Sequence, residues 1–330
     1  MNTTNPILQV KDLSVVFHTF EGSVQALDHV SFDLEPGETL GIVGESGCGK
    51  SVTSLSILRL IASPPGQITN GEILLWNKDL LKLSAPKMRT IRGEKISMIF
   101  QEPMTSLSPV FTVGEQIAEV FRQHRQMGRK AAIQKSVDML DKVNIPDPAK
   151  ASRYYPHEMS GGMRQRAMIA MALACEPEVL IADEPTTALD VTIQAQVIDL
   201  IKQLQRDMGM SVIFITHDLG VVAHTANRVI VMYVGRILEQ ALAADLFSAP
   251  LHPYTRGLME SIPRVIGRAS KEKRKLREIK GVVPSLLDLK PGCKFSERCP
   301  EVMDICRQKE PELIAVDKGR LCRCWLHGQR

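Results

Sequence analysis

The sequence reads Gly44-Glu45-Ser46-Gly47-Cys48-Gly49-Lys50-Ser51 directly after an apolar stretch, Thr39–Val43. The residues that follow, Val52–Leu60, have the apolar periodicity of a helix. The glycines of such a loop let the backbone curl, so that successive N–H groups point to one place at the positive end of the helix. The order of strand, glycine loop and helix therefore indicates a loop that binds an anion in an α/β protein.

This loop matches the P-loop pattern, and its residue types suit a nucleotide. Lys50 supplies a positive charge to the β- and γ-phosphates, and the Ser51 hydroxyl is suited to ligate Mg²⁺. ATP and Mg²⁺ are thus the expected cofactors. The other positions expected to contact ATP in this loop are Gly44, Glu45, Ser46, Gly47, Cys48, Gly49 and Val52.

A second apolar strand ends in two acids. Its sequence is Val179-Leu-Ile-Ala-Asp183-Glu184, the arrangement of a Walker B segment. Close to a P-loop, Asp183 can hold Mg²⁺ through water, and Glu184 can orient or deprotonate the water that attacks the γ-phosphate. Buried strands often end in a solvated acid without any catalytic role, so this interpretation depends on the P-loop. Together the two segments predict an enzyme that hydrolyses ATP.

Further short apolar strands alternate with segments of helical periodicity. They are expected at Thr39–Val43, Ile96–Phe100, Val179–Ala182, Val212–Thr216 and Val229–Tyr233. This alternation is typical of a parallel sheet with helices on both faces, so the predicted fold class is α/β. Residues 8–34 alternate as antiparallel strands do and predict an antiparallel β layer. Residues 112–159 lack clear strands and predict an inserted helical subdomain over about 103–160.

The distribution of charge along the sequence indicates where the first domain ends. The formal net charge is +4, and the basic excess lies from Gly267 onward. The charge run at 267–280 is expected to be a solvated linker, with contact to anionic lipid or RNA as the alternative. We therefore expect an ATPase domain over 1–266 and a C-terminal extension over 267–330. The apolar runs are shorter than the roughly 18 residues of a membrane span and the start carries no export signal, so a soluble cytoplasmic chain is expected.

The segment Met159-Ser160-Gly161-Gly162-Met163-Arg164-Gln165-Arg166 resembles the signature of ABC ATPases. Ser160 and the N–H groups of Gly161 and Gly162 precede an expected helix, Met163–Cys175, and suit a γ-phosphate. The resemblance implies the RecA-like core of P-loop NTPases. It also implies a head-to-tail dimer in which each signature completes the nucleotide site of the partner chain.

Other motifs of that family follow in the expected order. Gln101 resembles the Q-loop, Ala188-Leu-Asp190 the D-loop, and His217 the H-switch. By this resemblance Gln101 senses Mg²⁺ and the membrane partner, Asp190 communicates across the dimer, and His217 contacts the γ-phosphate. Gln101, Glu184 and His217 are therefore the expected catalytic residues, with Gln101 also near the metal.

An aromatic side chain near the first strand is expected to stack on the adenine ring. Phe17 is the candidate for this role, and Phe20 is a neighbour that could take it. Either ring could equally well belong to the protein core, so the interpretation leaves both alternatives open.

The signature has methionine at its first and fifth positions, Met159 and Met163. This variant resembles the D-type ATPase of dipeptide and oligopeptide importers, as do Gln101–Pro109, Tyr155–His157 and Leu251–Thr255. The resemblance implies a peripheral protein at the cytoplasmic face of the inner membrane. Its implied partners are a second ABC ATPase subunit, two transmembrane permease subunits and, through them, an extracytoplasmic peptide-binding protein. Nickel and antimicrobial-peptide importers are alternatives, as is a soluble ABC ATPase acting on ribosomes or DNA, although no nucleic acid is expected as a partner.

Five of the seven cysteines lie near the C-terminus. Four of them follow the spacing Cys293-x₅-Cys299-x₆-Cys306-x₁₇-Cys324, which resembles the extension of peptide-importer ATPases. In that subfamily these positions can bind a [4Fe–4S] cluster, and four thiolates suit iron–sulfur or zinc. Plain reduced thiols remain the third interpretation, and Cys322 could replace Cys324.

The two isolated cysteines have different expected environments. Cys175 ends an apolar helix and is expected to be a buried small hydrophobic residue. Cys48 lies in the phosphate loop at a helix N-terminus, which favours the thiolate. We therefore expect alkylation of Cys48 to block ATP binding.

Overall fold

The structure is a computed structural model that describes residues 5–101, 106–186, 190–261, 279–317 and 319–328. The chain divides into two compact units. Unit 1 comprises residues 1–8, 33–39 and 74–215, and unit 2 comprises residues 9–32, 40–73 and 216–330. Within the described ranges, none of the helices combines the length and the apolar character that crossing a membrane requires.

Unit 1 contains three parallel strands. They are β6 (Ile96–Ile99), β7 (Val179–Asp183) and β8 (Ser211–Thr216), and β7 pairs with both neighbours. Every residue of these strands is buried, as expected for parallel strands covered on both faces. The predicted strands at these places are confirmed, and their ends shift by one residue.

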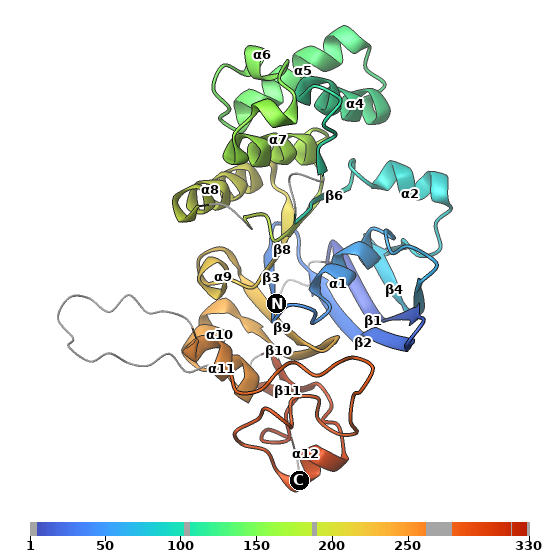
Figure 1. Cartoon of the computed structure of the whole chain (residues 1–330), viewed down its shortest axis with the longest axis vertical. Coiled ribbons are helices and arrows are strands. Elements are labelled where there is room, and N and C mark those ends of the chain that lie inside the picture. Colours follow the sequence, from blue (N-terminus) through green and yellow to red (C-terminus); the bar gives the residue numbers. More distant parts are fainter. Residues whose placement is uncertain (1–4, 102–105, 187–189, 262–278, 318, 329–330) are drawn as a thin grey trace, which may run out of the picture. The chain divides into compact units, whose positions relative to one another are not determined.

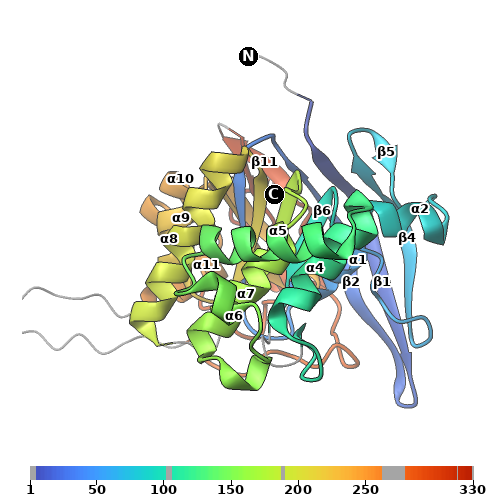
Figure 2. The ribbon, with the colours of Figure 1, turned by 90° about the horizontal axis from the view of Figure 1, so that it is seen from above.

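The other part of unit 1 is helical. Helices α4 (Val113–Arg125), α5 (Arg129–Lys142), α6 (Pro148–Ala151) and α7 (Gly161–Leu173) lie together, in green in Figure 1 and Figure 2. Thr112 begins α4 by accepting a hydrogen bond from the Glu115 N–H. The described residues between Thr112 and Met159 form helices and turns without a strand, as the sequence predicted. The remaining elements of unit 1 are α2 (Ala85–Ile91), β5 (Lys78–Asp79), the 3₁₀ turn η1 (Pro156–Glu158) and α8 (Val191–Met208).

Unit 2 contains a mixed sheet. Strand β3 (Thr39–Val43) is parallel to β9 (Arg228–Tyr233), and β9 is antiparallel to β10 (Arg236–Leu242). The chain end then adds β12 (Arg320–Cys322) beside β10 and β11 (Ile314–Asp317) beside β12. Figure 1 shows this C-terminal segment, in red, next to β10. The last three strands were absent from the sequence prediction.

The predicted antiparallel layer consists of long strands. The order is β2 (Gly22–Leu34), β1 (Leu8–Thr19) and β4 (Gly66–Leu75), and β4 was not predicted. Helix α1 spans Lys50–Ile57, so it begins two residues before and ends three residues before the predicted range. The other helices of unit 2 are α9 (Leu219–Thr225), α10 (Ala243–Ser248), α11 (Pro253–Glu260) and α12 (Asp304–Gln308).

Three aromatic rings join the C-terminal segment to the sheet of unit 2. The ring centroids of Tyr233 and Phe295 lie 5.5 Å apart, and those of Tyr254 and Phe295 lie 5.3 Å apart. All three side chains are buried in one apolar cluster. Offset and edge-to-face pairs at such distances add to the stabilisation from burial. The cysteine segment therefore shares its core with β9 and α11.

Replacing Phe295 by Ala should destabilise unit 2. Removal of a buried phenyl ring costs about 3–5 kcal/mol of unfolding free energy, because the transfer free energy is lost and a cavity remains. Urea unfolding of the full chain measures the loss. Val282 is 88% exposed, so Val282→Ala is the matched control in the same segment. Equal unfolding curves for the two variants would show that Phe295 does not anchor the segment.

Candidate functional site

The glycine loop between β3 and α1 has a backbone that only glycine allows at two positions. Gly44 has φ 155°, and a Cβ there would lie 2.3 Å from the carbonyl oxygen of Met232. Gly49 has φ 104°, and its Cβ would lie 2.8 Å from the Leu27 side chain. Side chains at either position would collide with the strands of unit 2. The loop is therefore held in its curl by close packing on both sides.

Lys50 lies inside this curl. Its side chain is 5% exposed, and Nζ donates hydrogen bonds to the carbonyl oxygens of Gly44 at 2.8 Å and Glu45 at 3.1 Å. A buried ammonium group is costly unless polar atoms surround it, and these two carbonyls provide that compensation. Ser51 follows as a half-buried residue in the first turn of α1. The loop thus places a positive charge at the N-terminus of α1, which suits a phosphate group.

Two residues far along the chain hold Glu45. Its N–H donates to the Tyr254 hydroxyl at 3.0 Å, and its carboxylate accepts two hydrogen bonds from the guanidinium group of Arg298. Burial raises the pKa of Tyr254, so this hydroxyl stays protonated. Neither partner was predicted from the sequence. The segment Leu251–Thr255 was noted as a family resemblance, but nothing in its pattern shows that Tyr254 contacts the loop.

The structure disfavours the thiolate that was expected at Cys48, whereas the effect of its alkylation on ATP binding stays a prediction. Its side chain is 1% exposed, and burial raises the pKa of the thiol although Lys50 opposes the effect. The sulfur lies 3.9 Å from Lys50 Nζ and fills the space inside the loop. Desolvation disfavours the thiolate more than the nearby cation and the helix end favour it. Cys48 is therefore a packing residue of the loop and not an exposed reactive thiol.

In unit 1, strand β7 presents the two predicted acids. Asp183 is 3% exposed, and Glu184 follows it with φ 46°, a left-handed conformation that is uncommon for glutamate. The Glu184 N–H donates to the Ile215 carbonyl at 2.8 Å and fixes this turn. Gln101 Nε2 donates to the Glu184 carboxylate at 3.0 Å. The structure thus brings together two predicted catalytic residues that lie 83 positions apart in the sequence.

The signature segment begins helix α7 as predicted. Ser160 is the N-cap, and its hydroxyl accepts from the Met163 N–H at 3.3 Å. Ser160 and Gly161 are exposed, and Gly162 is half-buried, so the first turn of this long helix faces outward. Met159, at the variant first position, is buried at 2% exposure as another apolar residue would be.

Gln165 is a residue of the site that the sequence analysis did not single out. It is 1% exposed, and its Nε2 donates to the carbonyl oxygen of Pro185. Pro185 directly follows Glu184, so this bond joins helix α7 to the turn that carries the acid. The available signal was the amide side chain at position 165 of the signature segment, because such a group needs a hydrogen-bond partner when it is buried.

The remaining predicted site residues are exposed or half-buried in the structure. His217 is exposed after β8, and the next residue, Asp218, caps α9 by accepting from the Gly220 and Val221 N–H groups. Asp190 is the exposed first residue before α8, whereas Ala188 and Leu189 lie outside the described residues. Phe17 is half-buried, with its ring close to Gly66, and Phe20 is fully exposed. The adenine contact therefore stays a prediction.

Comparison with known proteins identifies the family. A profile described as ABC transporter matches residues 27–187, and one described as oligopeptide/dipeptide transporter, C-terminal region, matches residues 238–306. The chain is 57% identical to a probable peptide ABC transporter ATP-binding protein, y4tR, of Sinorhizobium fredii, over 97% of this chain and 94% of that protein. It is 52% identical to the dipeptide transport ATP-binding protein DppD of Bacillus subtilis, over 98% and 96%. The chain belongs to the ABC transporter ATP-binding proteins.

A solved structure of an ABC ATPase has the same fold. It is the dimeric ATP-binding cassette MJ0796 in a post-hydrolysis state bound to ADP and phosphate, which is 27% identical to this chain. The TM-score is 0.64, and the match covers 72% of this chain and 98% of the cassette. The predicted family, the α/β fold class and the ATPase activity are confirmed.

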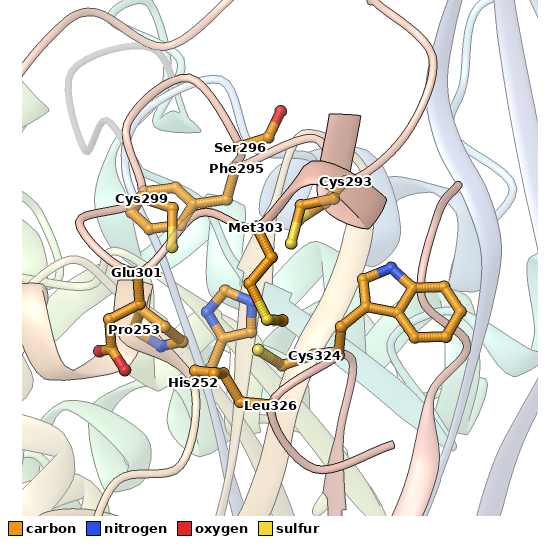
Figure 3. Close-up of a pocket in the computed structure, with 12 residues that line it drawn as sticks. His252, Pro253, Cys293, Phe295, Ser296, Cys299, Glu301, Met303, Cys324 and Leu326 are labelled. Atoms are coloured by element: carbon orange, nitrogen blue, oxygen red, sulfur yellow. The ribbon is translucent and has the colours of Figure 1, made fainter. Parts of the chain in front are cut away.

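The cysteine segment of this ABC ATPase forms a cavity. Its lining includes Cys293, Cys299, Cys306 and Cys324, whereas Cys322 is fully buried in β12 and is not among the lining residues. Figure 3 shows the labelled thiols around the side chain of Met303. Burial raises the pKa of Cys293 to about 12 and that of Cys299 to about 11, and neighbouring thiols act in the same direction. Among the described residues, no group of three or more His, Cys, Asp or Glu side chains is gathered closely enough to hold a single metal ion.

Alkylation of the folded ABC ATPase should spare Cys48. Because burial raises the pKa of its thiol, the reactive thiolate is scarce at pH 8 and increases only as the pH rises above the ordinary thiol range. Iodoacetamide labelling at pH 8, followed by mass spectrometry of the Cys48 peptide, measures the rate. In urea the same peptide should label fully, and this supplies the control. Rapid labelling of the folded protein would contradict the buried position.

Proposed function

We propose that this ABC ATPase energises a bacterial importer of dipeptides or oligopeptides. The observation that carries its chemistry is the contact between Gln101 and Glu184 at the end of β7. This contact fixes the direction of the Glu184 carboxylate, and a residue that activates water requires such a fixed position. The solute class is supported by the names of the relatives, which are peptide and dipeptide transport proteins at 57% and 52% identity.

We propose the following roles for the site residues in nucleotide binding and hydrolysis. Lys50 and the loop N–H groups would bind the β- and γ-phosphates, and Ser51 and Asp183 would hold Mg²⁺, which neutralises charge on the phosphates. Glu184 orients and deprotonates the attacking water. Gln101, which donates to the Glu184 carboxylate, would sense the bound metal. His217 completes the site as a hydrogen-bond partner of the γ-phosphate.

A head-to-tail dimer would complete each nucleotide site. The exposed first turn of α7 offers the Ser160 hydroxyl and the N–H groups of Gly161 and Gly162 to a γ-phosphate of the partner chain. The related cassette MJ0796 is described as dimeric, with ADP and phosphate bound, which supports this arrangement. We further propose a second ATPase chain as the partner, two permease subunits in the membrane, and a peptide-binding protein on the far side. The ATPase then acts at the cytoplasmic face.

A Glu184→Gln variant tests the mechanism. ATP hydrolysis should fall by about 10²–10⁴-fold because the amide cannot accept the proton of the attacking water, while nucleotide binding is retained. Phosphate release and binding of a fluorescent ATP analogue measure the two effects. Glu176 is an exposed acid of the same unit that pairs with Lys142, so Glu176→Gln is the matched control. Hydrolysis at the normal rate in Glu184→Gln would contradict the mechanism.

The solute class is tested with the same variants in cells. Deletion of the gene should abolish uptake of a labelled dipeptide, and the wild-type chain, but not Glu184→Gln, should restore it. Loss of labelled nickel uptake with unchanged dipeptide uptake would reject the peptide assignment and leave the ATPase mechanism intact.

We also propose that the cysteine cavity holds an iron–sulfur cluster. In a tetrahedral zinc site the sulfurs lie about 3.8 Å apart, because Zn–S bonds are about 2.3 Å long. The described thiols are not gathered in that way around a single point. The four thiols line one cavity, and four cysteine thiolates are the ligand set of a [4Fe–4S] cluster.

His252 supports the same assignment. It is 1% exposed and lines the cysteine cavity, and its Nδ1 accepts a hydrogen bond from the Tyr254 N–H. Burial lowers the pKa of His252 to about 3, so the ring is neutral and Nε2 carries the proton. Nε2 is buried and finds no hydrogen-bond partner among the described residues. A sulfur acceptor within the cavity would satisfy this donor. The cluster would serve to pin a segment that is too small for a core of its own.

Anaerobic purification tests the cluster. Iron and acid-labile sulfide should be present in equal amounts with visible charge-transfer absorbance, and a Cys299→Ser, Cys324→Ser variant should lose all three signals. Cys175 is buried in the other unit, so Cys175→Ser is the control that should keep them. Stoichiometric zinc without iron, or no metal at all, would reject the iron–sulfur proposal.

A further inference from the structure

Arg298 forms an ion pair with the phosphate loop from the far end of the chain. Its Nη1 donates to Glu45 Oε2 at 2.6 Å, and its Nη2 donates to Glu45 Oε1 at 2.9 Å. This two-bond geometry is the strong form of an arginine–carboxylate pair. The side chain of Arg298 is 5% exposed, so water screens the pair little.

The position of Arg298 is fixed by the C-terminal segment. Its Nε donates to the Lys280 carbonyl at 3.1 Å, and its guanidinium group lies over the ring of Tyr233, 5.8 Å from the centroid. The next residue is Cys299, which lines the cysteine cavity. A displacement of Cys299 would therefore act on the backbone next to Arg298.

Glu45 also contacts Lys50 directly. Its carbonyl oxygen accepts from Lys50 Nζ at 3.1 Å, and its N–H is held by the Tyr254 hydroxyl at 3.0 Å. The side chain, the N–H and the carbonyl of one residue thus contact Arg298, Tyr254 and Lys50. A shift of the Glu45 side chain would change the carbonyl that holds the phosphate-binding cation.

Electrostatics gives the pair a further effect. Glu45 is the second residue of a loop that receives a polyanion, and an unpaired carboxylate there would repel the phosphates. The guanidinium group of Arg298 offsets the negative charge of the Glu45 carboxylate. The pairing also costs little ordering entropy, because other contacts already hold the guanidinium group.

We propose that Arg298 is a positioning residue of the nucleotide site, through which the cysteine segment sets the affinity of the phosphate loop for ATP. Arg298 neutralises Glu45 and fixes the loop conformation that presents Lys50. The inference rests on nucleotide binding at this loop, which is part of the proposed function. It adds a regulatory link between the C-terminal segment and the loop of the same unit.

The test compares the full-length chain with Arg298→Ala, Arg298→Lys and the double variant Arg298→Ala, Glu45→Gln. Arg298→Ala should weaken binding of a fluorescent ATP analogue and raise the KM for ATP by about tenfold, because the carboxylate is left unpaired beside the phosphates, while kcat stays within about twofold. Arg298→Lys should lie in between, since lysine keeps the charge but cannot form both bonds. In the double variant no unpaired carboxylate remains, so most of the affinity should return.

Lys290→Ala is the matched control, because it breaks an exposed ion pair with Glu297 in the same segment. Thermal unfolding and the iron content of each variant report whether the segment stays folded. Nucleotide affinity in Arg298→Ala equal to that of Lys290→Ala would overturn the inference. A loss that Glu45→Gln does not repair would also overturn it, because it would indicate general damage to the segment. If the wild-type chain binds the analogue but does not hydrolyse ATP, the proposed function fails, and the affinity comparison still decides the role of Arg298.

Discussion

The structure depends on one buried positive charge. Lys50 is enclosed by the loop that it serves, and the free energy cost of that burial is offset by the carbonyls of Gly44 and Glu45. Those carbonyls can point inward only because Gly44 and Gly49 adopt backbone angles closed to other residues. A phosphate group that enters the loop therefore meets an ammonium group that two carbonyls already hold in place.

The C-terminal segment contributes to this arrangement. It lacks the size for a core of its own, and it instead packs Phe295 against both Tyr233 and Tyr254 and adds β12 beside β10 and β11 beside β12. Tyr254 belongs to both structures at once, since its ring packs on Phe295 and its hydroxyl holds the Glu45 N–H. The segment that carries the cysteines is thus part of the support of the phosphate loop.

Sequence reasoning succeeded where one local force decides the structure. The central strands are uniformly apolar, and glycine spacing defines the phosphate loop, so both were predictable. Strand β10 was missed because it contains Glu239, which is fully buried and accepts from the Leu251 and His252 N–H groups. Glu239 interrupts the apolar pattern by which a core strand is recognised, and the residues that satisfy its carboxylate lie outside the strand.

The errors in the site have the same origin. Cys48 was expected to be reactive because its helix position is visible in the sequence, whereas the packing that buries it is not. The role of Arg298 was not predicted because its partner, Glu45, lies 253 positions away in the sequence. The contact between Gln101 and Glu184 joins two separate strand ends, and periodicity gives no information on such a distance.

The turn at Glu184 shows how the acid of the site is held in place. Its left-handed backbone costs about 1–3 kcal/mol and persists only where the surroundings over-determine it. The Ile215 carbonyl fixes its N–H, and Gln165 fixes the carbonyl of the following Pro185. Gln165 belongs to the signature helix, so a pull on the exposed end of α7 would act on the residue after the acid. The Glu184 carboxylate meanwhile accepts a hydrogen bond from Gln101. A carboxylate can accept several hydrogen bonds, so Gln101 holds this group in position while it can still accept from water.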